Sequence, residues 1–158
     1  MIYTARYKSP LGGMTLASYG TALTALDFDD TGDCIRGTQN GLPVFEETCR
    51  WLDLYFDGKV PDFMPPLAPC GTAFQHAVWD ILRTIPYGKT TTYGRIAAQI
   101  AAARGGRMSA QAVGGAVGHN GISIIVPCHR VIGANGNLTG YAGGLDKKIK
   151  LLTLEKVL

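Results

Sequence analysis

The first thirty residues alternate between apolar and polar side chains in the way that β-strands do. Residues 2–8 alternate and are rich in Ile, Tyr and Thr, and residues 14–18 and 23–28 continue the pattern. The segment Ser9-Pro-Leu-Gly-Gly13 supplies turn residues between the first two. These segments predict a small antiparallel meander, and the polar, glycine-containing stretch 29–41 predicts a loop.

A helix and a proline-rich segment follow the predicted sheet. Apolar residues recur at helical spacing from Val44 to Phe56, and Gly58 is expected to end that helix. Residues 60–69 then contain four prolines in ten positions, which excludes a helix or a central strand. We interpret this segment as an extended linker, so the sequence predicts an N-terminal lobe with its linker over 1–69 and a second lobe over 70–158.

The second lobe has the pattern of packed helices. Thr72 and Gln75 have the spacing of a capping box, and apolar residues follow on one helical face as far as Ile85. A second helix is predicted from Tyr93 to Ala101, and Ser109 can cap a third that runs to about Val117. The last two predict a helix–turn–helix, although most such pairs only pack together.

The remainder of the second lobe is predicted to be a short buried strand, a long loop and a final helix. The strand is expected over residues 122–126, the loop over 127–144 and the helix over 146–158, with Ile149 and Leu152 facing inward. The fold class is therefore α+β. It combines an N-terminal α/β lobe that has a small antiparallel sheet with a C-terminal helical lobe that has a helix–turn–helix.

Composition and cysteine spacing exclude several classes of protein. No apolar run reaches the roughly 18 residues of a membrane span, and no secretory signal is evident, so the expected location is the cytoplasm. No two of the four cysteines form a Cys-x-x-Cys pair, so a zinc site of the usual spacing is not expected. No other metal and no cofactor are expected. Cys34, Cys49 and Cys70 have the default expectation of small buried side chains.

The formal charge of +3 is divided unevenly between the two predicted lobes. Residues 1–69 carry five Lys and Arg against nine Asp and Glu, a charge of −4, whereas residues 70–158 carry ten against three, a charge of +7. A basic lobe indicates contact with a polyanion. A chance asymmetry on a solvated surface explains the charges alone equally well.

The third predicted helix of the second lobe is unusually rich in glycine. Gly114, Gly115 and Gly118 lie in or at the end of it, and each interior glycine costs about 1 kcal/mol relative to alanine. A helix with almost no side chains can approach another backbone closely, in nucleic acid or in protein. Tight packing between helices explains Gly114 and Gly115 as well as a nucleic-acid partner does.

Pro127-Cys-His-Arg-Val131 holds the candidate nucleophile. A cysteine reacts as the thiolate, which a nearby base or cation favours. His129 can serve Cys128 only if the chain leaves strand geometry here, because neighbours on a strand point to opposite faces. Glu155 lies near the predicted inward face of the last helix and is a candidate partner for His129, as in a catalytic triad. A solvated Glu155 near the terminus is the alternative.

Three stretches together resemble one known family. Residues 114–120 (Gly-Gly-Ala-Val-Gly-His-Asn), 124–132 (Ile-Ile-Val-Pro-Cys-His-Arg-Val-Ile) and 140–145 (Gly-Tyr-Ala-Gly-Gly-Leu) are similar to the signature of the O6-alkylguanine-DNA alkyltransferases. The likeness extends from about Thr72 to Glu155. The family implies repair of O6-alkylguanine, with O4-alkylthymine as a further substrate, by stoichiometric transfer of the alkyl group to a cysteine.

The resemblance also implies a mode of DNA binding and a set of roles. The second helix of the motif enters the minor groove of double-stranded DNA, and the damaged nucleotide is flipped into a pocket. A monomer is expected. Cys128 would accept the alkyl group, His129 would act as base through a water with Glu155 behind it, Asn120 would be a hinge, and Tyr93 would donate to the leaving oxygen.

Further positions carry over as binding residues. The substrate-binding set comprises backbone groups of Cys128 together with Ser123, Val131, Tyr141, Ala142 and Gly143. The DNA-binding set comprises Gln111, Ala112, Gly114, Gly115 and Arg130, together with Arg95, Arg104 and Arg107, which are predicted from the basic charge of the second lobe and not from the resemblance.

Three departures from the family pattern affect these expectations. Gln111 stands where many members have an arginine finger, so it can bond an orphaned base but brings no charge. The turn over 101–108 is longer than in some relatives, and its Arg104 and Arg107 could supply that charge. Gly121 stands where proline often follows the asparagine, which predicts a looser hinge.

Two other functions share many of these features. A DNA-binding relative without transfer activity has tryptophan in place of the cysteine, which Cys128 argues against. A thiol hydrolase that uses Cys128 and His129 would turn over repeatedly and would not need DNA.

Overall fold

The computed structural model describes residues 1–29, 37–138, 140–141 and 143–158, so Cys34 and Ala142 lie outside the described residues. The chain divides into two compact units. The first comprises Met1–Cys70 with Gly121–Ser123, and the second comprises Gly71–Asn120 with Ile124–Leu158.

A small sheet forms the base of the first unit. The strands β1 (Tyr3–Ser9), β2 (Gly12–Ser18) and β3 (Leu23–Phe28) are consecutive and antiparallel, as the alternation predicts. A fourth strand, β4 (Thr38–Gln39), pairs in parallel with β1, which gives the order β3-β2-β1-β4. The prediction of a loop over 29–41 missed β4 because two polar residues carry no recognisable alternation.

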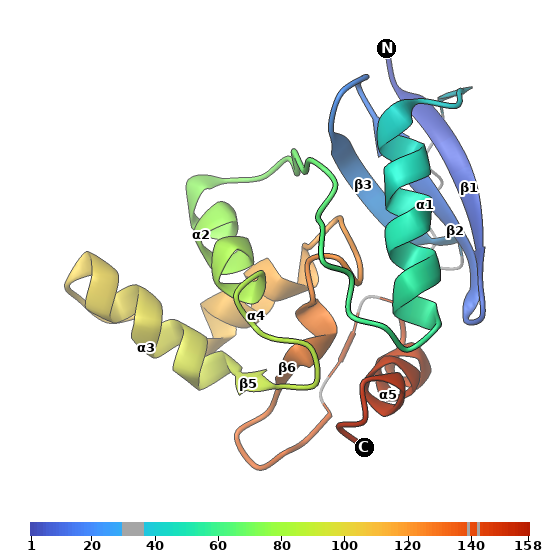
Figure 1. Cartoon of the computed structure of the whole chain (residues 1–158). Coiled ribbons are helices and arrows are strands. Elements are labelled where there is room, and N and C mark those ends of the chain that lie inside the picture. The colour runs from blue at the N-terminus through green and yellow to red at the C-terminus, as the bar shows by residue number, and fades with distance from the viewer. Residues whose placement is uncertain (30–36, 139, 142) are drawn as a thin grey trace. The chain divides into compact units, whose positions relative to one another are not determined.

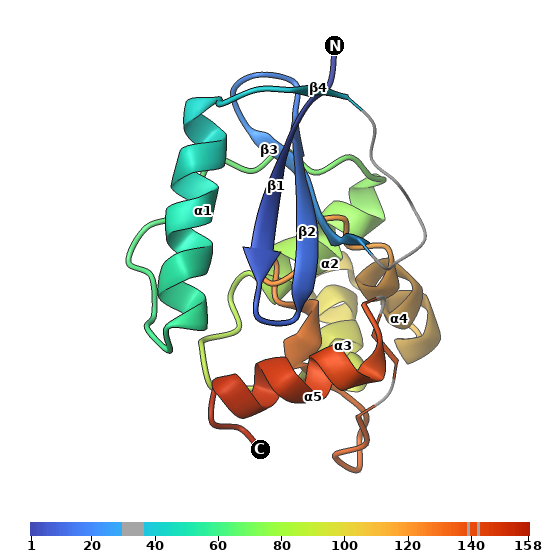
Figure 2. The same cartoon turned by 90° about the vertical axis from the view of Figure 1, so that its right-hand side faces the viewer.

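The helix α1 (Pro43–Phe56) covers one face of this sheet (Figures 1 and 2). Its start agrees with the preference for proline in the first helical turn, and Gly58 follows it with a φ of 79°. The core is apolar, and its fully buried members contribute roughly 1.5–3 kcal/mol each. They include Met14, Leu16, Leu26, Phe28, Leu52 and Tyr55.

The strand predicted over residues 122–126 is wrong. Ile122 forms an isolated bridge to Leu26, and the N–H of Ser123 donates to the Leu26 carbonyl over 2.8 Å. Ile124 then adopts a φ of 71°, a left-handed conformation that ends any strand. All five residues are buried, so their apolar run reflects burial of an irregular segment rather than strand pairing.

The second unit contains the remaining four α-helices among the described residues (Figure 1). Thr72 and Gln75 form the predicted capping box at the start of α2 (Ala73–Leu82). The helices α3 (Tyr93–Arg104) and α4 (Ala110–Gly118) are the predicted helix–turn–helix, and Ser109 caps α4 as expected. Trp79 ties α2 to α4, because its indole N–H donates to the Ala116 carbonyl over 2.9 Å.

Two very short strands were not predicted, yet they organise the second unit. The strand β5 (Thr91–Thr92) pairs in parallel with β6 (Val131–Ile132), which follows a 3₁₀ turn over Cys128–Arg130. Because α3 starts directly after β5, this pairing brings the beginning of α3 beside the cysteine segment.

The last helix, α5 (Leu145–Leu154), buries Leu152 as predicted but not Ile149. Ile149 is 38% exposed, so its expected inward position is wrong. The buried positions are Lys148, Leu151 and Leu152, and Glu155 continues that face at the end of the helix, where it is 2% exposed. In the described part of the chain, no helix has the length and apolar character needed to cross a membrane.

Candidate active site

Cys128 opens the 3₁₀ turn and borders a pocket. Pro127 precedes it, and the Cys128 N–H donates to the Val126 carbonyl over 2.8 Å, so the chain leaves strand geometry at this point. The side chain is 6% exposed, and it faces a cavity of about 280 Å³. That volume is near the lower end of small-molecule sites, which start at roughly 300 Å³.

The pocket brings together several of the predicted residues. Tyr93, Gly114 and Tyr141 line it with Cys128, although they come from the start of α3, the middle of α4 and the loop before α5. Val117, Gly118 and Gly140 complete the lining and were not predicted.

His129 faces a carboxylate in the interior. Its Nε2 lies 2.5 Å from Oε2 of Glu155, and both side chains are completely buried. Burial lowers the pKa of His129 below its usual value, although the hydrogen bond that the imidazole donates to Glu155 opposes that shift. The imidazole is therefore neutral near pH 7 and can accept a proton, as a general base must.

Glu155 is held by donors on several sides. Its Oε1 accepts from the Arg130 Nε over 2.8 Å and from the Gly88 N–H over 3.0 Å, and its Oε2 lies 3.2 Å from the Arg130 Nη2. Gly88 has a φ of 78°, a left-handed conformation that suits glycine. Since a buried carboxylate without partners is expensive, this set of donors explains why Glu155 can be buried.

Arg130 belongs to this interior network, which corrects its assignment to the DNA-binding set. Arg130 is 8% exposed. Its Nε and Nη2 donate to the two carboxylate oxygens of Glu155, and its Nη1 donates to the Ile85 carbonyl over 2.7 Å. The Tyr87 ring lies 5.8 Å from its guanidinium carbon. An arginine engaged in this way is not available to a phosphate at the surface.

Asn120 connects α4 to the cysteine segment. It comes just after His119, the C-cap residue of α4, is 7% exposed, and its Nδ2 donates to the Val126 carbonyl over 2.8 Å. The bond closes the irregular segment between α4 and Cys128, in keeping with the hinge role that the resemblance implies.

Sequence reasoning missed Lys148. Its side chain is completely buried, and its Nζ donates to the Val131 carbonyl over 2.7 Å. The spacing of 148, 151, 152 and 155 on one helical face was the available signal, but a lysine does not suggest burial. Of the other predicted binding residues, Ser123 lies in the first unit and Gly143 does not line the pocket.

The glycines of α4 are not explained by packing. A Cβ added at Gly115 or Gly118 would meet nothing within 4 Å, and one at Gly114 would meet only the Tyr93 ring at 3.8 Å, an ordinary contact. Gln111, Ala112 and Gly115 are exposed. Tight helix packing, the alternative left open by the sequence, therefore does not account for Gly115 or Gly118. The exposed face of α4 carries almost no long side chains.

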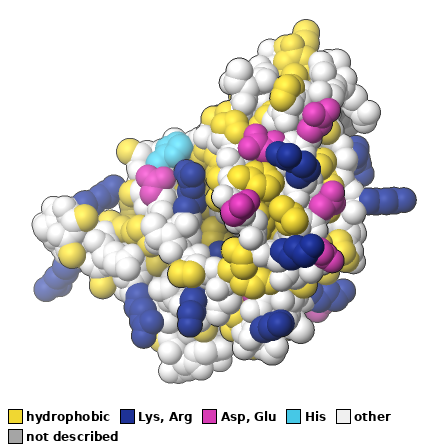
Figure 3. All heavy atoms as spheres, in the orientation of Figure 1, with side chains coloured by type: hydrophobic (Ala, Val, Ile, Leu, Met, Phe, Trp, Pro, Cys, Tyr) yellow, Lys and Arg dark blue, Asp and Glu magenta, His cyan; other side chains and the backbone are white. Residues whose placement is uncertain are grey.

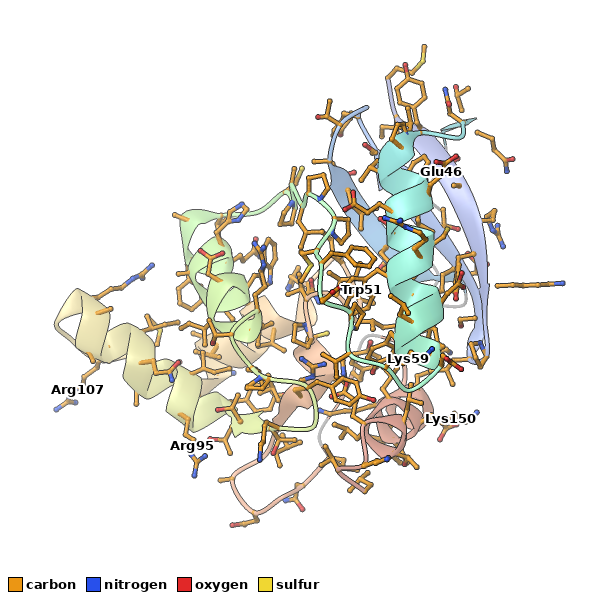
Figure 4. All side chains as sticks on the ribbon, in the orientation of Figure 1. Glu46, Trp51, Lys59, Arg95, Arg107 and Lys150 are labelled. Carbon is orange, nitrogen blue, oxygen red and sulfur yellow. The ribbon has the colours of Figure 1, made fainter. Side chains whose placement is uncertain are left out.

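Exposed basic side chains lie on α3 and in the turn of this helix–turn–helix. Arg95, Arg104 and Arg107 are exposed, and Figure 4 shows Arg95 and Arg107 pointing outward from the α3 region. Dark blue side chains follow the same region in the space-filling view of Figure 3. Arg104 also lies over the Phe74 ring, with 5.4 Å from its guanidinium carbon to the ring centre. Within the described ranges, no three His, Cys, Asp or Glu residues gather in a way that could hold a metal.

Comparison with known protein families covers nearly the whole chain. Residues 2–69 match the ribonuclease-like domain of 6-O-methylguanine DNA methyltransferase, and residues 73–157 match the DNA-binding domain of the same protein.

Individual relatives agree with the family matches. The methylated-DNA–protein-cysteine methyltransferase of Mycobacterium leprae is 48% identical over 99% of this chain and 93% of its own length. That of Haemophilus influenzae is 44% identical over 99% of this chain and 87% of its own. The crystal structure of Mycobacterium tuberculosis OGT in complex with DNA has a TM-score of 0.87 and 46% identity, and covers 98% of this chain and 92% of that one.

Proposed function

Because the chain belongs to the 6-O-methylguanine DNA methyltransferase family, we propose that it repairs O6-alkylguanine in double-stranded DNA by moving the alkyl group onto Cys128. The observation that carries this proposal is the placement of Cys128 at a pocket, beside an interior His129–Glu155 pair. O4-alkylthymine is a second substrate of the same chemistry. A DNA substrate fits the cytoplasmic location that the sequence predicts.

The transfer is a displacement at the alkyl carbon. The Cys128 thiol gives its proton to His129 through a water, and the thiolate sulfur attacks the carbon bonded to O6. A carbon–sulfur bond forms while the carbon–oxygen bond breaks and leaves its electron pair on the base. A proton that reaches the base through Tyr93, a pocket residue, restores guanine, so the reaction balances without a cofactor. The thioether is too stable for water to reverse.

The interior residues determine the state of the base catalyst. Glu155 accepts from the Arg130 fork and from Gly88, which favours its ionised form. A carboxylate at Nε2 of His129 fixes the imidazole orientation and stabilises the imidazolium that forms when the thiol proton arrives. Asn120, bonded to Val126, holds the segment that carries the nucleophile.

The exposed face of α4 is suited to the minor groove. The groove is only about 6 Å wide, so a helix that enters it needs small side chains, and Ala112, Gly115 and Gly118 provide them. Gln111 lies at the start of this face and can reach into the stack left by the flipped nucleotide. Arg95, Arg104 and Arg107 would contact phosphates on either side.

The single-turnover reaction can be tested with one incubation. A duplex that contains one O6-methylguanine is mixed with the protein, and the intact mass is measured. A protein that only binds the lesion gains no mass, and a thiol hydrolase consumes substrate repeatedly without DNA. Alkyl transfer adds one methyl group and then stops.

Gln111 has its own test within this proposal. Flipping a base costs a few kcal/mol, and a side chain that fills the gap recovers part of that cost. Gln111→Ala should therefore slow transfer from duplex DNA more than transfer from the free methylated base, and Gln111→Arg should retain or improve duplex activity. Equal losses on both substrates would mean that Gln111 only supports the fold. No loss on either would assign the role to Arg104 and Arg107.

A further inference from the structure

The exposed face of α4 ends at a histidine. Gln111, Ala112, Gly115, Gly118 and His119 are exposed and recur at helical spacing, so they share one face of the helix. The two glycines carry no side chain on this face, and Ala112 adds one methyl group. Gln111 and His119 are therefore its two long side chains, one at each end. The reaction proposed above makes no use of His119.

The His119 ring is held in one orientation and one tautomer. Its Nδ1 lies 2.8 Å from the Gly115 carbonyl oxygen. A carbonyl only accepts, so Nδ1 carries the hydrogen, and the neutral imidazole then has an acceptor at Nε2 on the far side of the ring. The backbone N–H of His119 donates to the same carbonyl over 3.2 Å, and the next residue, Asn120, is bonded to Val126. The exposed face of α4 thus ends in a fixed hydrogen-bond acceptor.

His119 adjoins the pocket that would receive the damaged base. Gly118 lines this pocket together with Cys128, and His119 is the next residue along the chain. A nucleotide that enters the pocket leaves its neighbouring base pairs in the duplex, where α4 meets their minor-groove edges. His119 is therefore placed to contact a base pair that flanks the lesion rather than the lesion itself.

A hydrogen-bond acceptor is selective in the minor groove. A·T and T·A pairs present only acceptors there, whereas a G·C pair adds one donor, the N2 amino group of guanine. Among the base edges, a neutral imidazole with an acceptor at Nε2 can bond only to that amino group. The amide of Gln111 offers both a donor and an acceptor, so Gln111 lacks this selectivity.

Building on the alkyl transfer proposed above, we propose that His119 recognises a base pair flanking the lesion and favours a guanine there. Its Nε2 accepts a hydrogen bond from the guanine N2 amino group through the minor groove. The Gly115 carbonyl makes this possible, because it holds the hydrogen of the ring on Nδ1. The protein therefore repairs lesions with a G·C pair at that position faster than lesions with an A·T pair.

Inosine is the sharpest probe, because inosine is guanosine without the N2 amino group. Duplexes carry one O6-methylguanine, with G·C or I·C at each position near the lesion in turn. The second-order rate of transfer is measured at about pH 8, where exposed histidines are neutral. At one flanking position, I·C in place of G·C should slow wild-type transfer about fivefold, the effect of one hydrogen bond. Because I·C pairs also open more readily, each rate ratio is compared between the wild type and the variants.

Two variants separate the acceptor from the other roles of this side chain. His119→Ala removes the ring, whereas His119→Arg still suits a helix C-terminus and attracts phosphate but has no acceptor. Both should lose the fivefold difference, although His119→Arg should bind DNA at least as tightly as the wild type. His76→Ala is the matched control and should keep the difference, because His76 lies on α2 with its ring centre 5.3 Å from that of Trp79. Transfer from the free methylated base should be equal in all four proteins.

A wild-type rate that does not change with inosine at any position would overturn the proposal, and so would a difference that survives in either His119 variant. Faster transfer beside I·C in the wild type alone would also overturn it, because the ring would then act as a donor. Circular dichroism establishes that each variant is folded, and if His119→Ala does not fold, His119→Arg decides the outcome.

A binding measurement keeps this proposal separate from the alkyl transfer. The affinity for a lesion-free duplex of G·C pairs is compared, at one salt concentration, with the affinity for the same duplex with inosine in place of every guanine. If the wild-type protein accepts no methyl group, the proposed function fails, and these affinities decide the role of His119. The wild type should then prefer the guanine duplex and His119→Arg should not, whereas equal ratios in the two proteins would overturn the role of His119.

Discussion

The two units differ in what they bury. Among the described residues, the first unit buries hydroxyl groups such as Thr48 and Ser18 within an apolar core, and its buried set contains no Asp, Glu, His, Lys or Arg. The second unit buries Asn120 and four side chains of that kind, namely His129, Arg130, Lys148 and Glu155. Buried charges are costly and often stabilise less than well-packed apolar residues would. Their concentration beside Cys128 supports the proposal that the second unit carries the chemistry.

Among the residues that surround Cys128, replacing His129 should give the largest loss of activity. His129→Gln removes the base while Glu155 retains a hydrogen-bonding partner, so transfer should slow by about 10²–10⁴-fold. DNA affinity should persist, because His129 is completely buried. Single-turnover rates and lesion-free binding measure the two effects. Unchanged thiol reactivity and pH profile in this variant would refute the proposed relay.

The lowered pKa of His129 also predicts two pH effects. The base form persists below the ordinary histidine value near 6.5, so the transfer rate should stay level as the pH falls through that value and decline only below it. The unfolded chain binds a proton in this window and the folded chain does not. Stability should therefore fall with pH below about 6.5, by at most about 1.4 kcal/mol per unit, and His129→Gln should flatten that slope. A denaturation series across pH tests this sign.

Removing Glu155 should give the largest loss of stability. Glu155→Ala leaves Arg130 as a buried charge and removes the acceptor for Gly88, which costs about 3–5 kcal/mol. Asp53→Ala is the matched change in the first unit, because the exposed Asp53 carboxylate accepts from the Tyr7 hydroxyl. This substitution should lower the free energy of unfolding by roughly 0.5 kcal/mol or less. Chemical denaturation measures the free energy of unfolding of both variants. Equal effects would remove the contrast between the units.

The bare face of α4 predicts that stability and DNA binding change in opposite directions. Gly115→Ala should stabilise the protein by about 1 kcal/mol, because alanine favours helix and the added methyl group meets nothing. The same methyl group should weaken duplex binding and slow transfer from DNA, whereas transfer from the free methylated base serves as the control and should not change. Duplex affinity that rises with stability would argue against α4 as the DNA-contacting helix.

The smallest expected effects concern surface charge. The affinity for lesion-free DNA should fall with salt, and replacing Arg95, Arg104 or Arg107 by alanine should flatten the log–log slope by about 0.9 for each phosphate that the arginine neutralises. Arg50→Ala in the first unit, where the exposed arginine lies over the Phe63 ring, is the control and should leave the slope unchanged. A triple alanine variant with the wild-type slope would reject these arginines as the electrostatic contact.

Local patterns predicted the longer elements and failed where distant segments decide the structure. The capping box at Thr72 and the cap at Ser109 depend on residues three apart, so they are visible in the sequence. The β5–β6 pairing joins segments about forty residues apart and has no local signal. Ile122–Val126 has the hydrophobicity of a strand, but Ile124 adopts a left-handed conformation that no periodicity reveals.

In the candidate site, too, the residues that local sequence indicates were predicted, and those that depend on distant segments were not. The Pro-Cys-His-Arg-Val string pointed to Cys128 and His129 directly. The structure buries Glu155, for which the sequence left an inward and a solvated position open. The sequence placed Arg130 in the DNA-binding set, and no local pattern indicated that Arg130 or Lys148 is buried. Their burial follows from acceptors at Glu155, Ile85 and Val131, which the fold assembles from separate segments.

The central claim is that Cys128 accepts one alkyl group and is then spent. The most direct measurement is the intact mass of the protein after incubation with an excess of duplex that carries O6-methylguanine, followed by peptide mapping. We expect one added methyl group per molecule, located on the Cys128 peptide, absent in Cys128→Ser and unaffected in Cys70→Ser, whose cysteine is exposed. Repair of more than one lesion per protein molecule, or a methyl group on any other residue, would contradict the claim.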